Sequence, residues 1–280
     1  MTQTACVFAS DLHGRVDRYQ KLFAAVAAEH PAAVFLGGDL LPLHSSGGFV
    51  EDVLAAGFEC AREANPSSSP RVFLIPGNDD PRAEEPAFLE AAGRSLWDYA
   101  HGRRFELGPF TVYGYACVPP TPFRLKDWER YDVSRYVEPG CVSPEEGIRT
   151  VPQPESESKW GTIAADLARL VGDDSLERAV LLLHAPPYGS KLDRAGLDGR
   201  VVDHAPVDVH VGSIAIRRFI EARQPLLTLH GHIHESARLT GSWSERIGRT
   251  FCFSAAHDGP ELALVRFELE DPGSARRELL

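Results

Sequence analysis

The chain has 280 residues, of which 43% are hydrophobic and 25% are charged, a balance that excludes a disordered chain, a coiled coil and a fibre. Its 29 Lys and Arg against 40 Asp and Glu give a formal net charge of −11, which disfavours non-specific binding to nucleic acid or anionic lipid. No apolar run approaches the roughly 18 residues that a membrane helix needs. A function that acts on small molecules remains compatible with this composition and charge.

The five cysteines are widely scattered, their number is odd and no CxxC pair occurs. This usage favours a reducing compartment over a disulfide framework. The N-terminal residues lack the basic region and apolar core of an export signal. We therefore expect a cytoplasmic protein, with residues 1–280 forming a single α/β domain.

Short apolar runs alternate with helical patterns in the first third of the chain. The runs at residues 5–9, 33–36 and 72–75 predict buried strands. Between them, apolar residues recur at helical spacing over residues 16–26 and 49–58. This β-α-β-α-β order predicts parallel neighbouring strands joined by right-handed crossovers.

The middle of the chain is less regular. Residues 110–115 predict another strand, whereas residues 119–154 contain seven prolines and no firm periodicity. Such a long Pro-rich loop is usually functional, although a surface excursion that packs its own aromatic residues explains it equally well. Five of its side chains could contact a substrate: Arg124, Lys126, Trp128, Arg130 and Tyr131.

Regular patterns return in the second half. A helical pattern covers residues 160–170, and Ser213 is a plausible N-cap for a further helix. The last forty residues predict short strands followed by a polar tail. The predicted strands of this half are 180–183, 226–229, 249–253 and 262–267.

Metal-ligating side chains follow five of the predicted strands. Because the carboxyl ends of parallel strands share one edge of a sheet, these side chains should converge. Residues two apart on an extended chain point the same way, so Asp11 and His13 can bind one ion together or one ion each. The same holds for His232 and His234. The whole set is Asp11, His13, Asp39, Asn78, His184, His232 and His234.

Imidazole, carboxylate and amide ligands together suit Mn, Fe or Zn. Seven ligands are too many for one tetrahedral zinc, but they suit two ions about 3.5–4 Å apart with a bridging carboxylate. Such a pair of ions binds phosphate oxygens and lowers the pKa of a bridging water.

Five sequence blocks in this order resemble the signature of the calcineurin-like metallophosphoesterases, in the bacterial and archaeal branch related to cyclic-nucleotide phosphodiesterases. They are D-x-H at residues 11–13, G-D at 38–39, G-N at 77–78, the lone His184 and G-H-x-H at 231–234. The resemblance implies a four-layer αββα sandwich of the metallo-dependent phosphatase type. It also implies two divalent metal ions at the rim, with Mn the first choice and Fe, Zn or Ni as alternatives.

Carried over position by position, the resemblance gives each ligand a role. Asp39 would bridge both metals, and a bridging hydroxide would attack phosphorus in line. The first metal would be held by Asp11, His13 and His234. The second would be held by Asn78, His184 and His232.

One position departs from the family pattern. The family commonly has G-N-H-[DE], where the His protonates the leaving group, but here the third residue is Asp79. An Asp with an ordinary pKa near 3.9 is ionised at neutral pH, and nearby metal ions should lower that pKa further. Asp79 is therefore the candidate catalytic residue. Because an ionised Asp is a poor proton donor, its presence here favours phosphodiesters as substrates over phosphomonoesters with poor leaving groups. His44 could replace the missing proton donor.

Two other functions stay open: a phosphomonoesterase or protein Ser/Thr phosphatase, and a metal-bound scaffold without activity. We expect a small phosphoester substrate, no membrane contact and no nucleic-acid partner, because no basic cluster occurs. Arg15 could clamp a substrate phosphate, although a salt bridge at a helix end explains it as well. Three further histidines have weaker claims to a role near the site: His204, His210 and His230.

Overall fold

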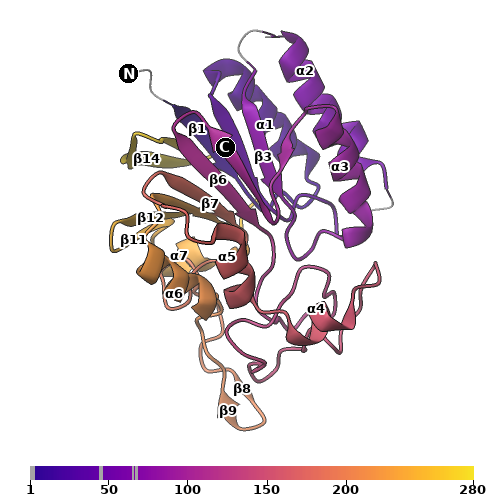
Figure 1. Ribbon diagram of the computed structural model, residues 1–280, viewed down its shortest axis with the longest axis vertical. Coiled ribbons are helices and arrows are strands. Elements are labelled where there is room, and N and C mark those ends of the chain that lie inside the picture. The colour runs from indigo at the N-terminus through magenta and orange to yellow at the C-terminus, as the bar shows by residue number, and fades with distance from the viewer. Residues whose placement is uncertain (1–3, 44–46, 65, 67–68) are drawn as a thin grey trace.

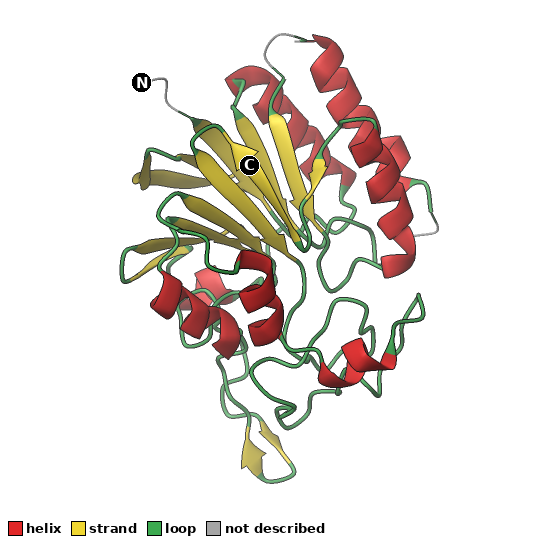
Figure 2. Cartoon of the chain, viewed as in Figure 1, coloured by secondary structure: helices red, strands yellow, loops and turns green. Residues whose placement is uncertain are grey.

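The computed structural model describes residues 4–43, 47–64, 66 and 69–280. Two six-stranded sheets pack face to face, and helices cover both outer faces (Figure 1). Figure 2 shows the long strands of the two sheets running toward the same end of the sandwich, where loops gather. The predicted four-layer αββα architecture is confirmed.

The first sheet has the strand order β14-β13-β1-β2-β3-β4. Its parallel part confirms the β-α-β-α-β prediction and consists of β1 (Ala5–Ala9), β2 (Ala33–Gly37), β3 (Arg71–Ile75) and β4 (Asp98–Tyr99). Two antiparallel strands extend it, β13 (Ala263–Glu268) and β14 (Asp271–Leu279).

The polar tail predicted at the C-terminus is wrong, because most of it forms β14. This strand lies at the edge of the first sheet, and most of its side chains are exposed or half-buried. Without a buried face, its sequence lacks the apolar alternation that marks a strand.

The central strands are apolar throughout because both of their faces are buried. In β2, Val34 and Leu36 belong to the core under the N-terminal helices, whereas Phe35 packs between the two sheets against Phe73. Alternate side chains of a strand point to opposite faces, so a strand in the middle of the sandwich needs apolar residues at every position. This explains why the sequence shows short continuous apolar runs.

Helices cover the outer face of the first sheet. α1 buries Tyr19, Leu22 and Val26 against it. The predicted second helix begins with a π-helical turn, η1, before its α-helical part. The elements on this side are α1 (Val16–Glu29), η1 (Val50–Ala55), α2 (Ala56–Ala64), the 3-10 turn η2 (Arg82–Glu84) and α3 (Glu85–Gly93).

The second sheet has the order β11-β12-β10-β7-β6-β5, with its four central strands parallel. Its edge strands β5 and β11 were not predicted, because exposed and half-buried residues predominate in both. The strands are β5 (Arg103–Leu107), β6 (Phe110–Tyr115), β7 (Ala179–Leu183), β10 (Leu227–His230), β11 (Ser244–Ile247) and β12 (Thr250–Ser254).

Two helices cover the outer face of this sheet, α5 (Ile163–Val171) and α6 (Ile214–Arg223). As predicted, Ser213 caps α6, since its Oγ accepts a hydrogen bond from the Ile216 amide at 3.0 Å. The predicted helix over residues 160–170 is interrupted, because Gly161 and Thr162 are extended between α4 (Glu155–Trp160) and α5.

The Pro-rich loop over residues 119–154 lacks helices and strands but is packed. Trp128 is buried and donates a hydrogen bond to the Asp80 carbonyl, and Lys126 is buried against Glu129. The substrate contact predicted for Lys126 and Trp128 is therefore wrong, because neither side chain reaches solvent. Three small elements lie further along the chain: β8 (Val201–Val202), β9 (Ala205–Pro206) and α7 (Ser236–Thr240).

Candidate metal centre and the cavity beside it

The seven predicted ligands come together at one rim of the sandwich. Asp11 and Asp39 follow β1 and β2 of the first sheet, while His184 and His232 follow β7 and β10 of the second. The parallel strands of both sheets end at this rim, so side chains far apart in the sequence meet there. The structure thus places them as the sequence suggested; their role as ligands stays a prediction.

The ligand atoms form two groups that share Asp39. In each group, one nitrogen or carboxylate oxygen per residue lies within 4.8 Å of all the others. The first group is Asp11, His13, Asp39 and His234, and the second is Asp39, His184 and His232. Asn78 belongs with the second group, because its Oδ1 lies 3.1 Å from His184 Nε2. Two centres that share one carboxylate are the arrangement that a pair of metal ions requires.

The surroundings of His184 fit a cation. Its Nδ1–H donates a hydrogen bond to the Gly37 carbonyl at 2.7 Å, because a carbonyl can only accept. Its Nε2 then faces Asn78 Oδ1 at 3.1 Å and Asp39 Oδ2 at 3.3 Å. In the neutral histidine, three acceptor atoms would point at one another. A proton or a metal ion between them removes that conflict.

Unpartnered polar atoms mark the other group. Asp11 Oδ2 and His13 Nδ1 are buried without a hydrogen-bond partner. The Nε2 atoms of His13 and His234 lie 3.0 Å apart, and Asp11 Oδ1 lies 3.3 Å from His234 Nε2. Since a buried polar atom without a partner costs roughly 1–3 kcal/mol, this donor set fits a bound divalent ion.

The protonation of the cluster supports the same assignment. Burial alone would raise the pKa of Asp39 and of Asp11, but the charges of nearby histidines lower both pKa values. Although burial opposes it, the charge of Asp39 raises the pKa of His184 to about 10. Burial lowers the pKa of His232 to about 3, so this imidazole is neutral and offers a free electron pair. Positive charge is therefore favoured among these carboxylates.

The backbone at the rim is strained. Four of the predicted ligands have positive φ angles, a conformation that side chains other than glycine rarely adopt. They are Asp11 (57°), His13 (48°), Asp39 (53°) and His232 (73°). The glycines of the sequence blocks give them room: a Cβ on Gly77 would lie 2.2 Å from Asp39 Oδ1, and one on Gly231 would lie 2.6 Å from Asp11 Oδ2.

Asp80 supports the centre from behind, a role that sequence reasoning missed. Its buried carboxylate accepts hydrogen bonds from the amides of Leu40, Leu41 and Gly77. It therefore ties the loop after β2 to the loop after β3, and so fixes Asp39 against Asn78. The only signal in the sequence is its fourth place in the Gly77–Asp80 block, where the family pattern has Asp or Glu.

Asp79 lies beside the cluster and lines a cavity next to it. Its Oδ1 accepts a hydrogen bond from Asn78 Nδ2, and its Oδ2 lies 3.8 Å from His13 Nδ1. Its own amide donates to Asp39 Oδ1 at 2.8 Å. In the protein alone, burial and the charge of Asp39 raise the pKa of Asp79. This direction is opposite to the one that bound cations would produce.

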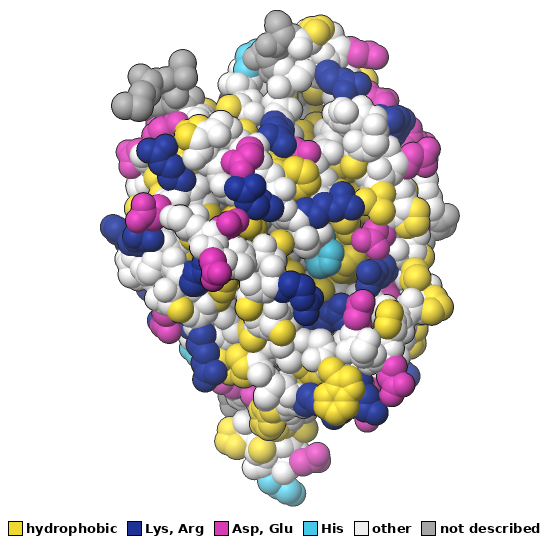
Figure 3. Space-filling view, viewed as in Figure 1, with side chains coloured by type: hydrophobic (Ala, Val, Ile, Leu, Met, Phe, Trp, Pro, Cys, Tyr) yellow, Lys and Arg dark blue, Asp and Glu magenta, His cyan; other side chains and the backbone are white. Residues whose placement is uncertain are grey.

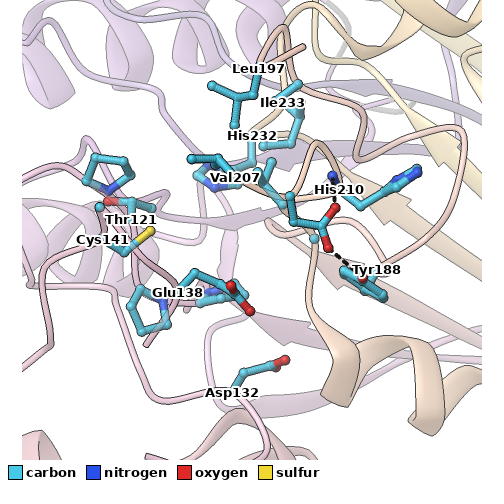
Figure 4. A pocket seen from close by; sticks show the side chains of 18 of the residues that line it. Thr121, Asp132, Glu138, Cys141, Tyr188, Leu197, Val207, His210, His232 and Ile233 are labelled. Atoms are coloured by element: carbon cyan, nitrogen blue, oxygen red, sulfur yellow. Dashed lines mark hydrogen bonds between the residues drawn. The ribbon is translucent and has the colours of Figure 1, made fainter. Parts of the chain in front are cut away.

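The cavity has a volume of about 660 Å³ and opens from the predicted ligands. The Pro-rich loop supplies one wall, with Thr121, Glu138 and Cys141, and the opposite wall holds Leu197 and Ile233 (Figure 4). His232 and His234 also line it, together with Asp39 and Asn78. A molecule bound to the centre would therefore extend between these two walls.

Several further residues were weaker candidates for a role in the site. Arg15 is exposed, pairs with Asp17 and is not among the residues that line the cavity, so its role as a phosphate clamp stays a prediction. His230 is buried between the Ala185 carbonyl and Thr228 Oγ1, behind the ligands. His210 lines the cavity, but its ring points away from the side chains of the facing wall (Figure 4). Its Nδ1 forms a hydrogen bond with the buried Asp193 carboxylate. His44 lies outside the described residues.

None of the helices in the described part of the chain is both long and apolar enough to span a bilayer. No curated protein sequence matches the chain significantly. Solved structures do match over nearly its full length. The protein TT1561 of Thermus thermophilus is 17% identical with a TM-score of 0.56, and the alignment covers 99% of each chain. A dimetal phosphatase from Danio rerio is 14% identical with a TM-score of 0.53, covering 95% of this chain and 93% of the other.

At such low identity these two structures establish a shared fold and nothing more. The sequence itself matches a family model, the one described as calcineurin-like phosphoesterase, over residues 6–236. That range begins in β1 and ends after the G-H-x-H block, so it includes all seven predicted ligands. The chain therefore belongs to the calcineurin-like phosphoesterase family.

Proposed function

We propose that the protein is a dimetal phosphodiesterase. The observation that carries this proposal is the pair of ligand groups that share Asp39, several of whose members line a large cavity. When bound, two divalent ions supply Lewis acidity to phosphate oxygens and lower the pKa of a nearby water. Family membership favours hydrolysis of a phosphoric ester, and the finer choice of diesters rests on this chain's own residues.

Each predicted ligand has one place in this proposal. Asp39 would be a ligand of both ions, because it belongs to both groups. The strained backbone and the backing carboxylate of Asp80 hold these side chains in position before any ion binds. The first ion would be held by Asp11, His13 and His234, and the second by Asn78, His184 and His232.

Two features favour diesters over monoesters. A diester has a second organic group, and the cavity gives it room beside the centre. A monoester with a poor leaving group depends most on a proton donor, and Asp79 stands where the family has its histidine. A carboxylate that accepts a hydrogen bond from Asn78 orients that ligand but has no proton to give while it is ionised.

We propose Mn²⁺ as the working ion, with Fe, Zn and Ni as alternatives, since the mixed nitrogen and oxygen ligands accept all four. We place the protein in the cytoplasm. All five cysteines are free, and three of them are buried, a pattern that a reducing compartment preserves.

A paired assay tests the proposal. Chelator-treated protein is reloaded with Mn²⁺ and given bis-p-nitrophenyl phosphate and p-nitrophenyl phosphate side by side. We expect metal-dependent hydrolysis with the higher kcat/KM for the diester. A higher kcat/KM for the monoester would support the phosphomonoesterase instead. No hydrolysis of either compound with metal bound would support the inactive scaffold.

A further inference from the structure

We propose, on the basis of the phosphodiesterase function above, that the substrate carries a bulky, uncharged apolar group. This alkyl or aryl group occupies the cavity beside the metal centre, and the acidic cavity walls reject a second negative charge. The substrate class is thus a monoanionic phosphodiester with one apolar ester group. The proposal rests on the composition, exposure and rigidity of the two walls.

The first wall is a proline-lined surface of the loop over residues 119–154. Pro119, Pro120, Pro122 and Pro139 all line the cavity, and Phe123 joins them. Prolines have no backbone N–H to offer a polar ligand, and their rings present carbon to the cavity. This wall therefore recognises apolar surface rather than hydrogen-bonding groups.

The second wall is aliphatic. Leu197, Val201, Val202 and Val207 come from the segment that contains the β8–β9 hairpin, and Ile233 lies between two predicted metal ligands. Ile233 thus connects this wall directly to the centre. An ester group that extends from the bound phosphate toward this wall would contact methyl groups along its whole length.

Apolar side chains also remain exposed at the mouth of the cavity. Phe123, Tyr136 and Val201 line it with 60%, 64% and 57% of their surface exposed. Figure 3 shows hydrophobic side chains gathered at the lower end of the molecule, over the β8–β9 hairpin. Exposed apolar groups next to one another usually mark a surface that a ligand covers. Here the walls are continuous with the metal centre, so the ligand is the substrate itself.

The charges in the cavity exclude a further anion. Among the described residues that line it, Arg200 is the only Lys or Arg. Four carboxylates line it away from the metal centre and Asp79, and the Glu138 carboxylate makes no hydrogen bond or ion pair with any described residue. A substrate with a second phosphate or a carboxylate would be repelled, whereas an uncharged group would not. The four are Asp132, Glu138, Asp208 and Glu235.

The walls are held in place without a ligand. Asp132 of the loop accepts hydrogen bonds from Ser213 Oγ at 2.5 Å and from the Ile214 amide at 2.7 Å, which fixes the loop to the start of α6. Asp208 accepts a hydrogen bond from Tyr188 at 2.6 Å in the opposite wall (Figure 4). A preformed apolar cavity loses little entropy on binding, so its contacts contribute to affinity.

The test uses Mn²⁺-loaded enzyme and a series of p-nitrophenyl alkyl phosphates from methyl to octyl, below micelle-forming concentrations. We expect kcat/KM to rise about two- to fourfold per added CH2 until the cavity is filled, because each buried methylene gains hydrophobic free energy. A flat or falling series with an active methyl ester would overturn this inference alone. Loss of hydrolysis for every ester, with two Mn²⁺ bound, would overturn the phosphodiesterase proposal as well.

Two variants with equally exposed aromatic side chains separate the cavity from the general surface. Phe123 is 60% exposed and lines the cavity, whereas Trp160 is 61% exposed and does not. We expect Phe123→Ser to lower kcat/KM for the octyl ester at least threefold more than it lowers kcat/KM for the methyl ester. Trp160→Ser should change neither. Equal effects of the two variants would contradict the proposed wall.

A third experiment tests whether the carboxylates of the cavity disfavour a negatively charged substrate group. We compare an octyl chain ending in a carboxylate with one ending in a hydroxyl, since both ends are polar and only one is charged. The carboxylate ester should react about three- to fivefold more slowly, and Glu138→Gln should narrow that difference. Equal rates for the two esters would show that the acidic wall does not select against anions.

Discussion

Oδ2 of Asp39 lies 3.3 Å from Nε2 of His184, although Asp39 follows a strand of the first sheet and His184 follows a strand of the second. Both side chains are buried, and each belongs to a group of side chains able to bind a metal ion. This contact links the two halves of the sandwich at the rim. The fold itself therefore sets the spacing on which a two-metal site depends.

Asp39→Asn removes the only carboxylate common to both ligand groups. We expect kcat/KM for bis-p-nitrophenyl phosphate to fall by on the order of 10²–10³ or more, because two bound metal ions contribute several kcal/mol to catalysis. Circular dichroism should show an unchanged fold. Asp127→Asn is the control, since Asp127 is also buried but binds the Arg82 amide outside the centre. Wild-type activity in Asp39→Asn would contradict the shared-ligand assignment.

Asp79→His restores the residue type that the family commonly has at this place. We expect turnover of an alkyl phosphomonoester such as glycerol 2-phosphate, followed by phosphate release, to rise at least tenfold, because general acid catalysis contributes roughly 10²–10⁴-fold. Asp79→Asn serves as the comparison and should bring no gain. Equal turnover of glycerol 2-phosphate by the two variants would show that the missing histidine does not limit protonation of the leaving group.

The buried ion pair in the Pro-rich loop predicts a large effect on stability. Lys126 Nζ lies 2.5 Å from Glu129 Oε2, and both side chains are fully buried. Lys126→Met should lower the free energy of unfolding by about 3–5 kcal/mol, because it leaves a buried carboxylate unpaired. Lys159→Met, which breaks an exposed pair with Glu155, should cost less than about 1 kcal/mol. Urea unfolding measures both, and equal losses would indicate a loosely packed loop.

His101 predicts how stability depends on pH. Its Nδ1 accepts a hydrogen bond from the Ala116 amide, and burial, with the charges of Arg82 and Arg130, lowers its pKa to about 3. The unfolded chain, with a pKa near 6.5, therefore binds a proton that the folded protein refuses. Stability from this residue is present above pH 6.5 and is lost as the pH falls toward 3.

His101→Asn keeps an acceptor for the Ala116 amide but cannot take up a proton. Between pH 6.5 and 5, the free energy of unfolding of the wild type should fall more steeply than that of the variant, by up to about 1.4 kcal/mol per pH unit. Urea unfolding in the presence of chelator, at several pH values, measures both slopes. Identical slopes would contradict the lowered pKa.

Much of the fold could be predicted because its central strands are buried on both faces. The apolar runs that became β1, β2, β3, β7 and β10 are unmistakable, and the order of strands and helices then implies parallel sheets. The edge strands β5, β11 and β14 were missed, since a strand whose side chains are mostly exposed or half-buried has no clear apolar pattern. Tertiary pairing rather than local sequence forms these strands.

The metal cluster could be located for the same reason. A polar residue that directly follows a buried strand lies at the rim of its own sheet, which predicts that Asp11, Asp39 and Asn78 lie close together. His184 follows a strand of the other sheet, so its place beside Asp39 was expected only from the resemblance to the family. The cavity walls could not be predicted. They depend on contacts between segments that are far apart in the sequence. Asp132 of the Pro-rich loop contacts Ser213, and Gly140 of the same loop lies beside Val202. The sequences of these segments have no hydrophobic periodicity that would predict such contacts.

The most direct test of the account is a titration of metal-free protein with Mn²⁺. Bound Mn²⁺ per chain is measured by elemental analysis at each step, and hydrolysis of bis-p-nitrophenyl phosphate is measured on the same samples. The account predicts little activity up to one ion per chain, a rise between one and two, and a plateau at two. Full activity with one ion, or none with two, would contradict it.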